Sequence, residues 1–164
     1  MVESIRRMKS EELFSRYKGK SVLVTGANGF VAGYLIPRLI ELGADVHGVD
    51  LQECSEFQGC THHRCDLLNF EEMEAIIVQC RPSFVFHLAS QSSVGTSWQH
   101  EWQTIETNSR STYNLFKALE KPLLPVRLLL VSSIEVYGDH GFKKVTVRDD
   151  LRPANPYAVS KAMT

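Results

Sequence analysis

The chain has 164 residues, with 18 Lys and Arg against 19 Asp and Glu, a net charge of −1, and 43% apolar residues. This composition is that of an ordinary globular protein with enough chain for one domain and its core. The near-zero charge argues against nucleic acid as a partner, because domains that bind it carry a large basic excess. The sequence shows no apolar run that could span a membrane and no signal peptide, so we expect a cytoplasmic protein.

The first predicted element is a short amphipathic helix that begins at Ser10 and ends near Gly19, and we expect residues 1–19 to be a helical extension. After it, short apolar or alternating segments predict five strands, and helical periodicity predicts the helices between them. The predicted strands are residues 21–25, 45–50, 62–65, 83–88 and 126–131, and the predicted helices are residues 29–43, 71–78 and 98–119.

This order of elements indicates an α/β fold. Strands of four to six residues that alternate with helices imply right-handed crossovers and a parallel sheet covered on both faces. We therefore predict a doubly wound, Rossmann-like sheet over residues 20–164. At the end of the fourth predicted strand, His87 is interpreted as a hydrogen-bonded strand residue rather than a catalyst.

The turn after the first strand is rich in glycine, with the sequence TGANGFVAG. A glycine turn between a buried strand and a helix lets the backbone approach a pyrophosphate, whose charge the N–H groups at the helix start then bind. Two glycines alone are weak evidence, but the strand before them and the helix after them favour a dinucleotide site. The residues predicted to bind the cofactor here are Gly26, Asn28, Gly29, Phe30 and Val31.

Two acidic residues follow the next strands. Asp50 ends the second strand, 24 positions after Gly26, where a carboxylate accepts hydrogen bonds from the adenosine ribose and repels a 2′-phosphate. The cofactor is therefore predicted to be NAD rather than NADP. Asp66 follows the third strand, where it could receive the adenine amino group or equally well cap a turn.

The four cysteines do not predict a metal site. Cys60 and Cys65 lie near His62 and His63, but this spacing contains no CxxC or HxxxH half-site. Neighbouring histidines on a strand also point to opposite faces. We expect reduced thiols and no bound metal.

The fifth strand and the segment after it carry candidate catalytic residues. Ser133 and Glu135 follow the strand, at the edge of a parallel sheet where ligands bind. Tyr157 and Lys161 are four residues apart and share one face of a helix. A lysine held as a cation beside the phenol would help Tyr157 to give up and take back a proton near neutral pH.

Together these segments resemble the short-chain dehydrogenase/reductase superfamily, in its extended branch of nucleotide-sugar epimerases, dehydratases and 4-keto reductases. The matching motifs are TGANGFVAG, GVD, CDLLN, HLASQSSVGTSW, VSSIEVYG and NPYAVSKA, which span residues 21–163. The HLASQSSVGTSW and SSIEVYG motifs are most similar to those of the GDP-mannose 4,6-dehydratase and GDP-4-keto-6-deoxymannose reductase group.

The resemblance implies roles for individual residues. Ser133 would hydrogen-bond the reacting sugar oxygen, Tyr157 would be the acid and base, and Lys161 would also bind the nicotinamide ribose. The substrate implied is a nucleotide-diphosphate sugar. Further residues expected near the cofactor are Leu67, Leu88, Ala89 and Ser90.

Ile134 departs from the dehydratase pattern, because an apolar side chain stands where those enzymes carry an acidic or hydroxyl residue beside a match to Glu135. Glu135 can still act as acid or base, or be structural. Epimerase or reductase is therefore favoured over dehydratase. Two alternatives stay open: an NADP(H)-dependent 4-keto-sugar reductase, and a catalytically silent dinucleotide-binding or regulatory protein.

Thr164 comes three residues after Lys161, so we expect the substrate-binding lobe of similar proteins to be missing from these residues. Such a fragment is expected to turn over substrate weakly or not at all. Similar proteins pair through helices on the outer face of the sheet, and the predicted helix 98–119 makes a homodimer plausible.

Overall fold

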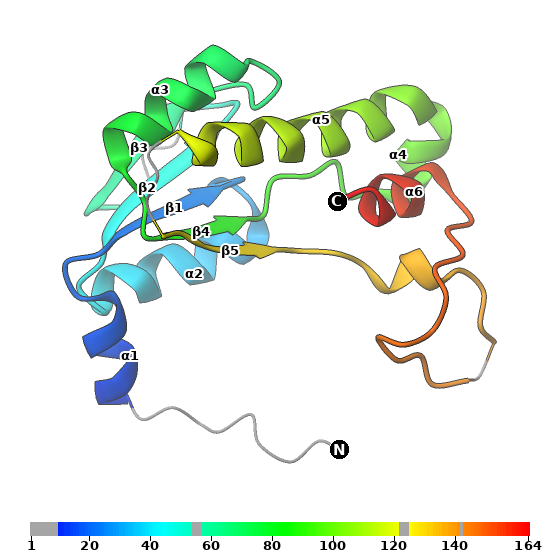
Figure 1. The fold of residues 1–164 in the computed structure, drawn as a ribbon, viewed down its shortest axis with the longest axis horizontal. Coiled ribbons are helices and arrows are strands. Elements are labelled where there is room, and N and C mark those ends of the chain that lie inside the picture. Colours follow the sequence, from blue (N-terminus) through cyan, green and yellow to red (C-terminus); the bar gives the residue numbers. More distant parts are fainter. Residues whose placement is uncertain (1–9, 54–56, 122–124, 142) are drawn as a thin grey trace.

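The computed structural model describes residues 10–53, 57–121, 125–141 and 143–164. Its centre is a five-stranded parallel sheet with the strand order β3-β2-β1-β4-β5 (Figure 1). The strands are β1 Ser21–Thr25, β2 Asp45–Asp50, β3 Cys60–Arg64, β4 Phe84–His87 and β5 Arg127–Leu130. The sequence therefore predicted the fold class and all five strands correctly: the ends of β1 and β2 match, and those of β3, β4 and β5 differ by one or two residues.

Helices cover both faces of this sheet. In Figure 1, α2 lies against one face and α3 and α5 lie against the other. The helices are α1 Ser10–Tyr17, α2 Phe30–Glu41, α3 Phe70–Cys80, α4 Val94–Gln99, α5 Glu101–Glu120 and α6 Pro156–Ala162, with the 3-10 helix η1 Ile134–Tyr137. No helix in the part of the chain that the structure describes is long and apolar enough to cross a membrane.

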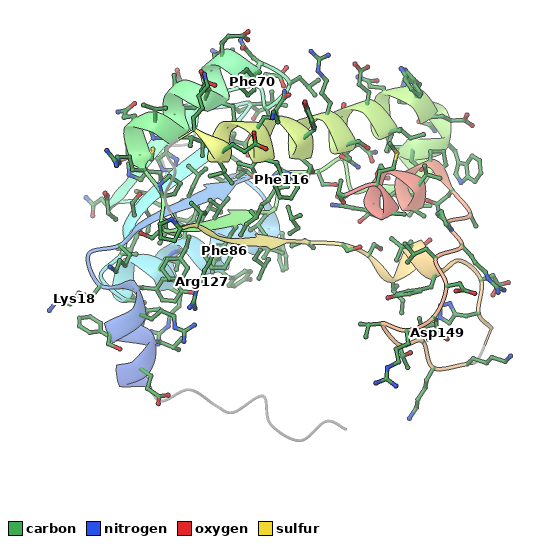
Figure 2. All side chains as sticks on the ribbon, in the orientation of Figure 1. Lys18, Phe70, Phe86, Phe116, Arg127 and Asp149 are labelled. Carbon is green, nitrogen blue, oxygen red and sulfur yellow. The ribbon has the colours of Figure 1, made fainter. Side chains whose placement is uncertain are left out.

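The strand β1 lies in the middle of the sheet, and this position accounts for its run of apolar residues. Leu23 points toward α3 and α5, whereas Val22 and Val24 point toward α2, and all three side chains are fully buried. A strand covered on both faces needs apolar residues at successive positions rather than at alternate ones. Figure 2 shows the side chains that fill both layers.

The predicted helix 98–119 is wrong in one respect, because the chain breaks at His100. The φ of −134° at His100 ends α4 and starts α5 in a new direction. Trp98 and Trp102 therefore belong to different helices, and both side chains are exposed in this chain. The helical periodicity of the sequence does not mark this break. The prediction also missed the start of α4, whose N-terminus Ser93 caps by accepting a hydrogen bond from the Thr96 N–H.

The short helix α1 packs beside the start of β4. The ring of Tyr17 packs against that of Phe84, with centroids 4.8 Å apart, and Gly19 N–H donates to the Gly43 carbonyl at 2.7 Å. The predicted helical extension thus forms over its described part, and residues 1–9 lie outside the described residues.

After β5 the chain leaves the sheet, as Figure 1 shows. It passes through η1 and a long loop before α6 brings it back beside α4 and α5. This path carries Tyr157 and Lys161 to the edge of the sheet at which β1, β2 and β4 end.

Candidate functional site

The glycine turn between β1 and α2 is built around Gly26. Its φ of +70° is a left-handed conformation, and a Cβ there would lie 2.8 Å from the backbone nitrogen of Ala89. Only glycine avoids both problems. Gly29 stands at the start of α2 and has no side chain with which to cap it, so the N–H groups of the first turn are available to a ligand.

Asp50 supports this turn from the end of β2. Its Oδ2 accepts a hydrogen bond from the backbone N–H of Asn28 at 3.0 Å, and the Asn28 amide in turn donates to the Gln52 carbonyl at 3.3 Å. One carboxylate thus fixes the shape of the turn and stands at the place where the sequence analysis expected the ribose. Asn28 does not line the cavity, and it contributes to the shape of the turn through its hydrogen bond to Asp50.

The end of β3 contributes Cys65 and Asp66. Asp66 is exposed, and its Oδ1 accepts from the Leu68 N–H at 2.9 Å, so the capping role foreseen for it is present. Burial, with smaller contributions from Glu72 and Asp66, raises the pKa of the Cys65 thiol to about 12. Cys65 is therefore a neutral thiol at physiological pH and not a nucleophile.

His87 is buried at the end of β4 and is held from both sides. Its Nδ1 is 2.7 Å from Thr25 Oγ1, and its Nε2 is 3.1 Å from Thr112 Oγ1. Burial, and secondarily the charge of Lys161, lower the pKa of His87 to about 4. The imidazole is neutral near pH 7, which confirms its interpretation as a hydrogen-bonded strand residue.

Tyr157 and Lys161 lie on α6, which Asn155 caps through a hydrogen bond from the Ala158 N–H at 2.7 Å. The ammonium of Lys161 donates to the Val131 carbonyl at 3.0 Å and lies 5.9 Å from the centroid of the Tyr157 ring. Burial lowers the pKa of Lys161 from its ordinary value. The contact with Val131 fixes the lysine beside the phenol.

Ser133 and Glu135 are engaged locally. Ser133 Oγ accepts from the Glu135 N–H at 3.2 Å and thereby starts η1. Glu135 Oε2 accepts from the side-chain amide of Asn155 at 2.9 Å. Glu135 thus orients the residue that caps α6.

One cavity of about 570 Å³ joins these parts. Within the described residues, its lining contains every predicted cofactor residue except Asn28, and it contains Tyr157 and Lys161 but neither Ser133 nor Glu135. The lining residues are Gly26, Gly29, Phe30, Val31, Ala32, Val49, Asp50, Leu51, Cys65, Asp66, Leu67, Leu68, Leu88, Ala89, Ser90, Gln91, Ser92, Thr107, Ser111, Val131, Tyr157 and Lys161.

The position of the cavity follows from the strand order. From β1 the chain winds outward to β2 and β3, and then returns to add β4 and β5 on the other side. Parallel sheets bind ligands at this switch point, beyond the carboxyl ends of the strands. The two acids therefore lie on one side of β1, and the residues from β4, β5 and α6 lie on the other.

The sequence analysis missed the role of Gln91 and Asn108. The amide of Asn108 accepts from the Gln91 N–H at 2.8 Å and donates to the Gln91 carbonyl at 3.0 Å and to Ser160 Oγ at 2.8 Å. It therefore connects the loop after β4 to α6. A polar residue on the buried face of α5 was the available signal, but its partners are distant in sequence.

The lining fits a dinucleotide. Gln91 Oε1 is buried without a hydrogen-bond partner among the described residues, although its residue lines the cavity, and a ligand donor would satisfy it. Apolar walls such as Leu51 and Leu67 suit an adenine ring, Asp50 suits ribose hydroxyls, and the first turn of α2 suits the pyrophosphate.

Comparison with known proteins agrees with this geometry. The sequence model of the NAD dependent epimerase/dehydratase family matches residues 22–164. The chain belongs to this family, within the extended short-chain dehydrogenases/reductases.

Members of the family with curated functions are similar over most of the chain. It is 30% identical to a GDP-mannose 4,6-dehydratase of Sordaria araneosa, over 87% of this chain and 28% of that protein. It is 28% identical to a UDP-glucuronate 4-epimerase of Thermodesulfobacterium geofontis, over 85% of this chain and 47% of that protein. The chain thus spans half or less of the length of these relatives.

A solved member of the family has the same fold. The UDP-glucose 4-epimerase of Thermus thermophilus, in complex with NAD, superposes with a TM-score of 0.77 at 29% identity, over 86% of this chain and 47% of that one. The agreement confirms the predicted family and the Rossmann-like class.

Proposed function

We propose that the chain forms the NAD-binding part of an enzyme that acts on nucleotide-diphosphate sugars, as an epimerase or a related oxidoreductase. The observation that carries this proposal is one shared cavity, because its lining contains both the glycine turn and the Tyr157–Lys161 pair. A protein that only binds a dinucleotide has no need of a lysine fixed beside a phenol at the same cavity.

The residues around the turn favour NAD over NADP. Asp50 presents a carboxylate where the adenosine ribose would lie, and a 2′-phosphate there would meet a like charge. Phe30 and Val31, at the start of α2, offer backbone N–H groups to the pyrophosphate, and Gly29, whose own N–H donates to the Gly26 carbonyl at 2.9 Å, allows its close approach. On the β4 side, Leu88, Ala89 and Ser90 line the approach to the nicotinamide.

In this proposal NAD supplies the acceptor for a hydride from a sugar carbon. The Lys161 ammonium would stabilise the Tyr157 phenolate, which takes the proton from the sugar hydroxyl at that carbon and becomes the neutral phenol. The bond from Lys161 to the Val131 carbonyl keeps the ammonium in place during this step. The Ser133 hydroxyl donates to the reacting oxygen.

Glu135 and Ile134 bear on which reaction follows. The carboxylate of Glu135 is bound to the Asn155 amide, and Ile134 is an exposed apolar residue without an acidic proton. Elimination of a C6 hydroxyl needs an acid beside it. These two observations favour epimerisation or reduction over dehydration, with Glu135 as the residue that positions α6.

The experiment compares the unmodified sequence with Tyr157→Phe, each within a longer protein that includes a substrate-binding lobe, in the presence of NAD and UDP-, GDP- or dTDP-hexoses. The ring and its packing are kept, so NAD should bind with unchanged affinity in calorimetry. Formation of reduced nicotinamide, followed by its absorbance, should fall by ~10² or more because the proton acceptor is lost.

Two outcomes would contradict the proposal. Equal reduction by Tyr157→Phe would remove Tyr157 as the proton carrier. Binding of NAD without any reduction by that longer protein, with every hexose, would favour a silent dinucleotide-binding protein.

A further inference from the structure

A second group of reactive side chains lies apart from the cofactor cavity, where β2, β3 and α3 meet. It consists of His47 on β2, His63 on β3 and Cys80, the last residue of α3. The register pairs His47 with Thr61 and Val49 with His63, so both histidines point to the face that α3 covers. One ligand atom from each of the three residues lies within 4.8 Å of the other two.

The separations are those of ligands around one small ion. His47 Nδ1 and His63 Nε2 are 3.1 Å apart, and Cys80 Sγ is 3.6 Å from the same His63 nitrogen. A tetrahedral zinc ion with ordinary bond lengths separates two nitrogens by about 3.3 Å and a nitrogen from a sulfur by about 3.6 Å. The third pair of ligand atoms, the His47 nitrogen and the Cys80 sulfur, lies within 4.8 Å and needs to move only about 1 Å closer to reach that geometry.

Hydrogen bonds alone do not satisfy this arrangement. The Nε2 atom of a neutral imidazole carries either one proton or one lone pair and makes one strong hydrogen bond. Here His47 and Cys80 both approach Nε2 of His63, so one of them is left without a good partner. A cation placed between the three atoms would satisfy all of them at once.

The surroundings suit a metal ligand. The other ring nitrogen of His47, Nε2, is 3.4 Å from Asp45 Oδ2. A carboxylate behind a ligating histidine is the usual second contact in zinc sites, where it fixes the tautomer and strengthens the ligand. The His47 side chain is 12% exposed, which leaves an ion access from solvent.

The chemistry of the three groups suits a cation. A neutral imidazole binds a metal through the lone pair of its unprotonated nitrogen, whereas a cysteine sulfur binds as the thiolate. Metal binding would therefore displace the thiol proton of Cys80.

We propose that His47, His63 and Cys80 form a zinc site, with a water molecule as the fourth ligand. Two imidazoles and one thiolate select zinc over magnesium or calcium, which prefer oxygen. Zinc binding releases one proton to solvent, from Cys80, and involves no redox change. The ion would fasten β3, an edge strand without a fully buried side chain, to α3.

The test is a titration of the metal-free full chain with Zn²⁺, in parallel with Mg²⁺. We expect one Zn²⁺ per chain in calorimetry and a rise in the unfolding temperature, and no effect of Mg²⁺. Co²⁺ in place of Zn²⁺ should give a thiolate-to-metal charge-transfer band. Absence of this band, or of stoichiometric Zn²⁺ binding, would overturn the site, and neither readout depends on NAD or on catalysis.

Matched variants locate the ligands. Cys80→Ser should abolish the charge-transfer band, and His63→Gln should weaken Zn²⁺ at least ~100-fold. His62→Gln is the control for the imidazole, since His62 lies on the same strand and points to the opposite face, where it stacks on Phe57. Zinc binding that His63→Gln leaves unchanged, or that His62→Gln weakens equally, would contradict the assignment.

Discussion

The crossover from β1 to β2 and the segment that follows β5 are held in place by different means. Around β1, apolar residues fill both faces of the sheet, and backbone contacts and Asp50 hold the glycine turn that we propose as the cofactor site. After β5, the chain runs through residues exposed to solvent, of which Val131 is 45% and Val147 93% exposed. Figure 2 shows Asp149 on the outer loop, away from the packed layers.

The two regions form the two ends of the cavity, one proposed to bind the cofactor and the other proposed to carry the catalytic residues. The proposed cofactor end of the cavity rests on the central core, whereas the proposed catalytic end lies on the short helix α6. This helix packs against α4 and α5 and is oriented by polar contacts of Asn108, Glu135 and Lys161. We therefore expect changes near β1 to unfold the domain and changes near α6 to disturb only the catalytic end.

The largest expected effect contrasts a leucine of β1 with a leucine of the segment after β5. Leu23→Ala empties a fully buried position, and we expect it to lower the free energy of unfolding by about 3–4 kcal/mol, because apolar burial is lost and a cavity is left. Leu151→Ala, at an exposed position after β5, should cost less than about 1 kcal/mol. Urea denaturation of both variants checks this, and similar costs at the two sites would erase the distinction between the regions.

Acidification provides the next effect, through His87. Its pKa is about 4 when folded and near 6.5 when unfolded, so the unfolded chain takes up a proton first as the pH falls. This contribution to stability is complete above pH ~6.5 and is lost toward pH ~4, by about 3 kcal/mol in total.

The measurement is urea denaturation at several pH values for the unmodified chain and for His87→Gln, which can still reach Thr25 and Thr112 but does not titrate. Other groups contribute equally to both proteins. The unmodified chain should lose more stability than the variant as the pH falls from 6.5 to 4. Parallel curves would show that His87 is not buried as a neutral imidazole.

Asn108→Ala should affect the attachment of α6. It removes an amide that bonds Gln91 and Ser160, and the loss of these buried contacts should cost about 2 kcal/mol. In hydrogen exchange, α6 should lose protection while β1 keeps it. Gln103→Ala, at an exposed position on the same helix, is the control. Equal loss of protection in β1 would mean that the two regions unfold as one unit.

The smallest effect concerns the cofactor end alone. Asp50→Asn keeps an oxygen for the Asn28 N–H but loses the charge, and we expect NAD to bind about tenfold more weakly, or ~1.4 kcal/mol. Binding of NADP should improve relative to NAD. Calorimetry with both cofactors measures this, with Asp45→Asn at the start of the same strand as control in metal-free buffer. Tighter binding of NADP by the unmodified chain would overturn the choice of NAD.

The parts of the molecule that the sequence predicted are those that depend on local chemistry. The strand SVLVT, the glycine turn and Asp50 each follow from burial, backbone freedom or charge over a few residues. Right-handed crossovers predicted a parallel sheet with helices on both faces. These rules predicted Gly26, Gly29 and Asp50 as cofactor residues, and all three line the same cavity.

The parts that the sequence did not reveal depend on distant partners. Asn108 meets Gln91 and Ser160 across 17 and 52 positions, and no local pattern shows this. The expectation of no metal considered the cysteines and histidines of residues 54–65, whereas the cluster proposed above combines His63 with His47 and Cys80. The helix break at His100 was missed because helical periodicity continues on both sides of it.

The most direct measurement is a crystal structure of the chain with NAD. The pyrophosphate should lie at the first turn of α2, the adenosine ribose at Asp50, and the nicotinamide ring beside the Tyr157 hydroxyl and the Lys161 ammonium. A nicotinamide ring bound away from Tyr157, or a cofactor bound outside this cavity, would contradict the proposed function.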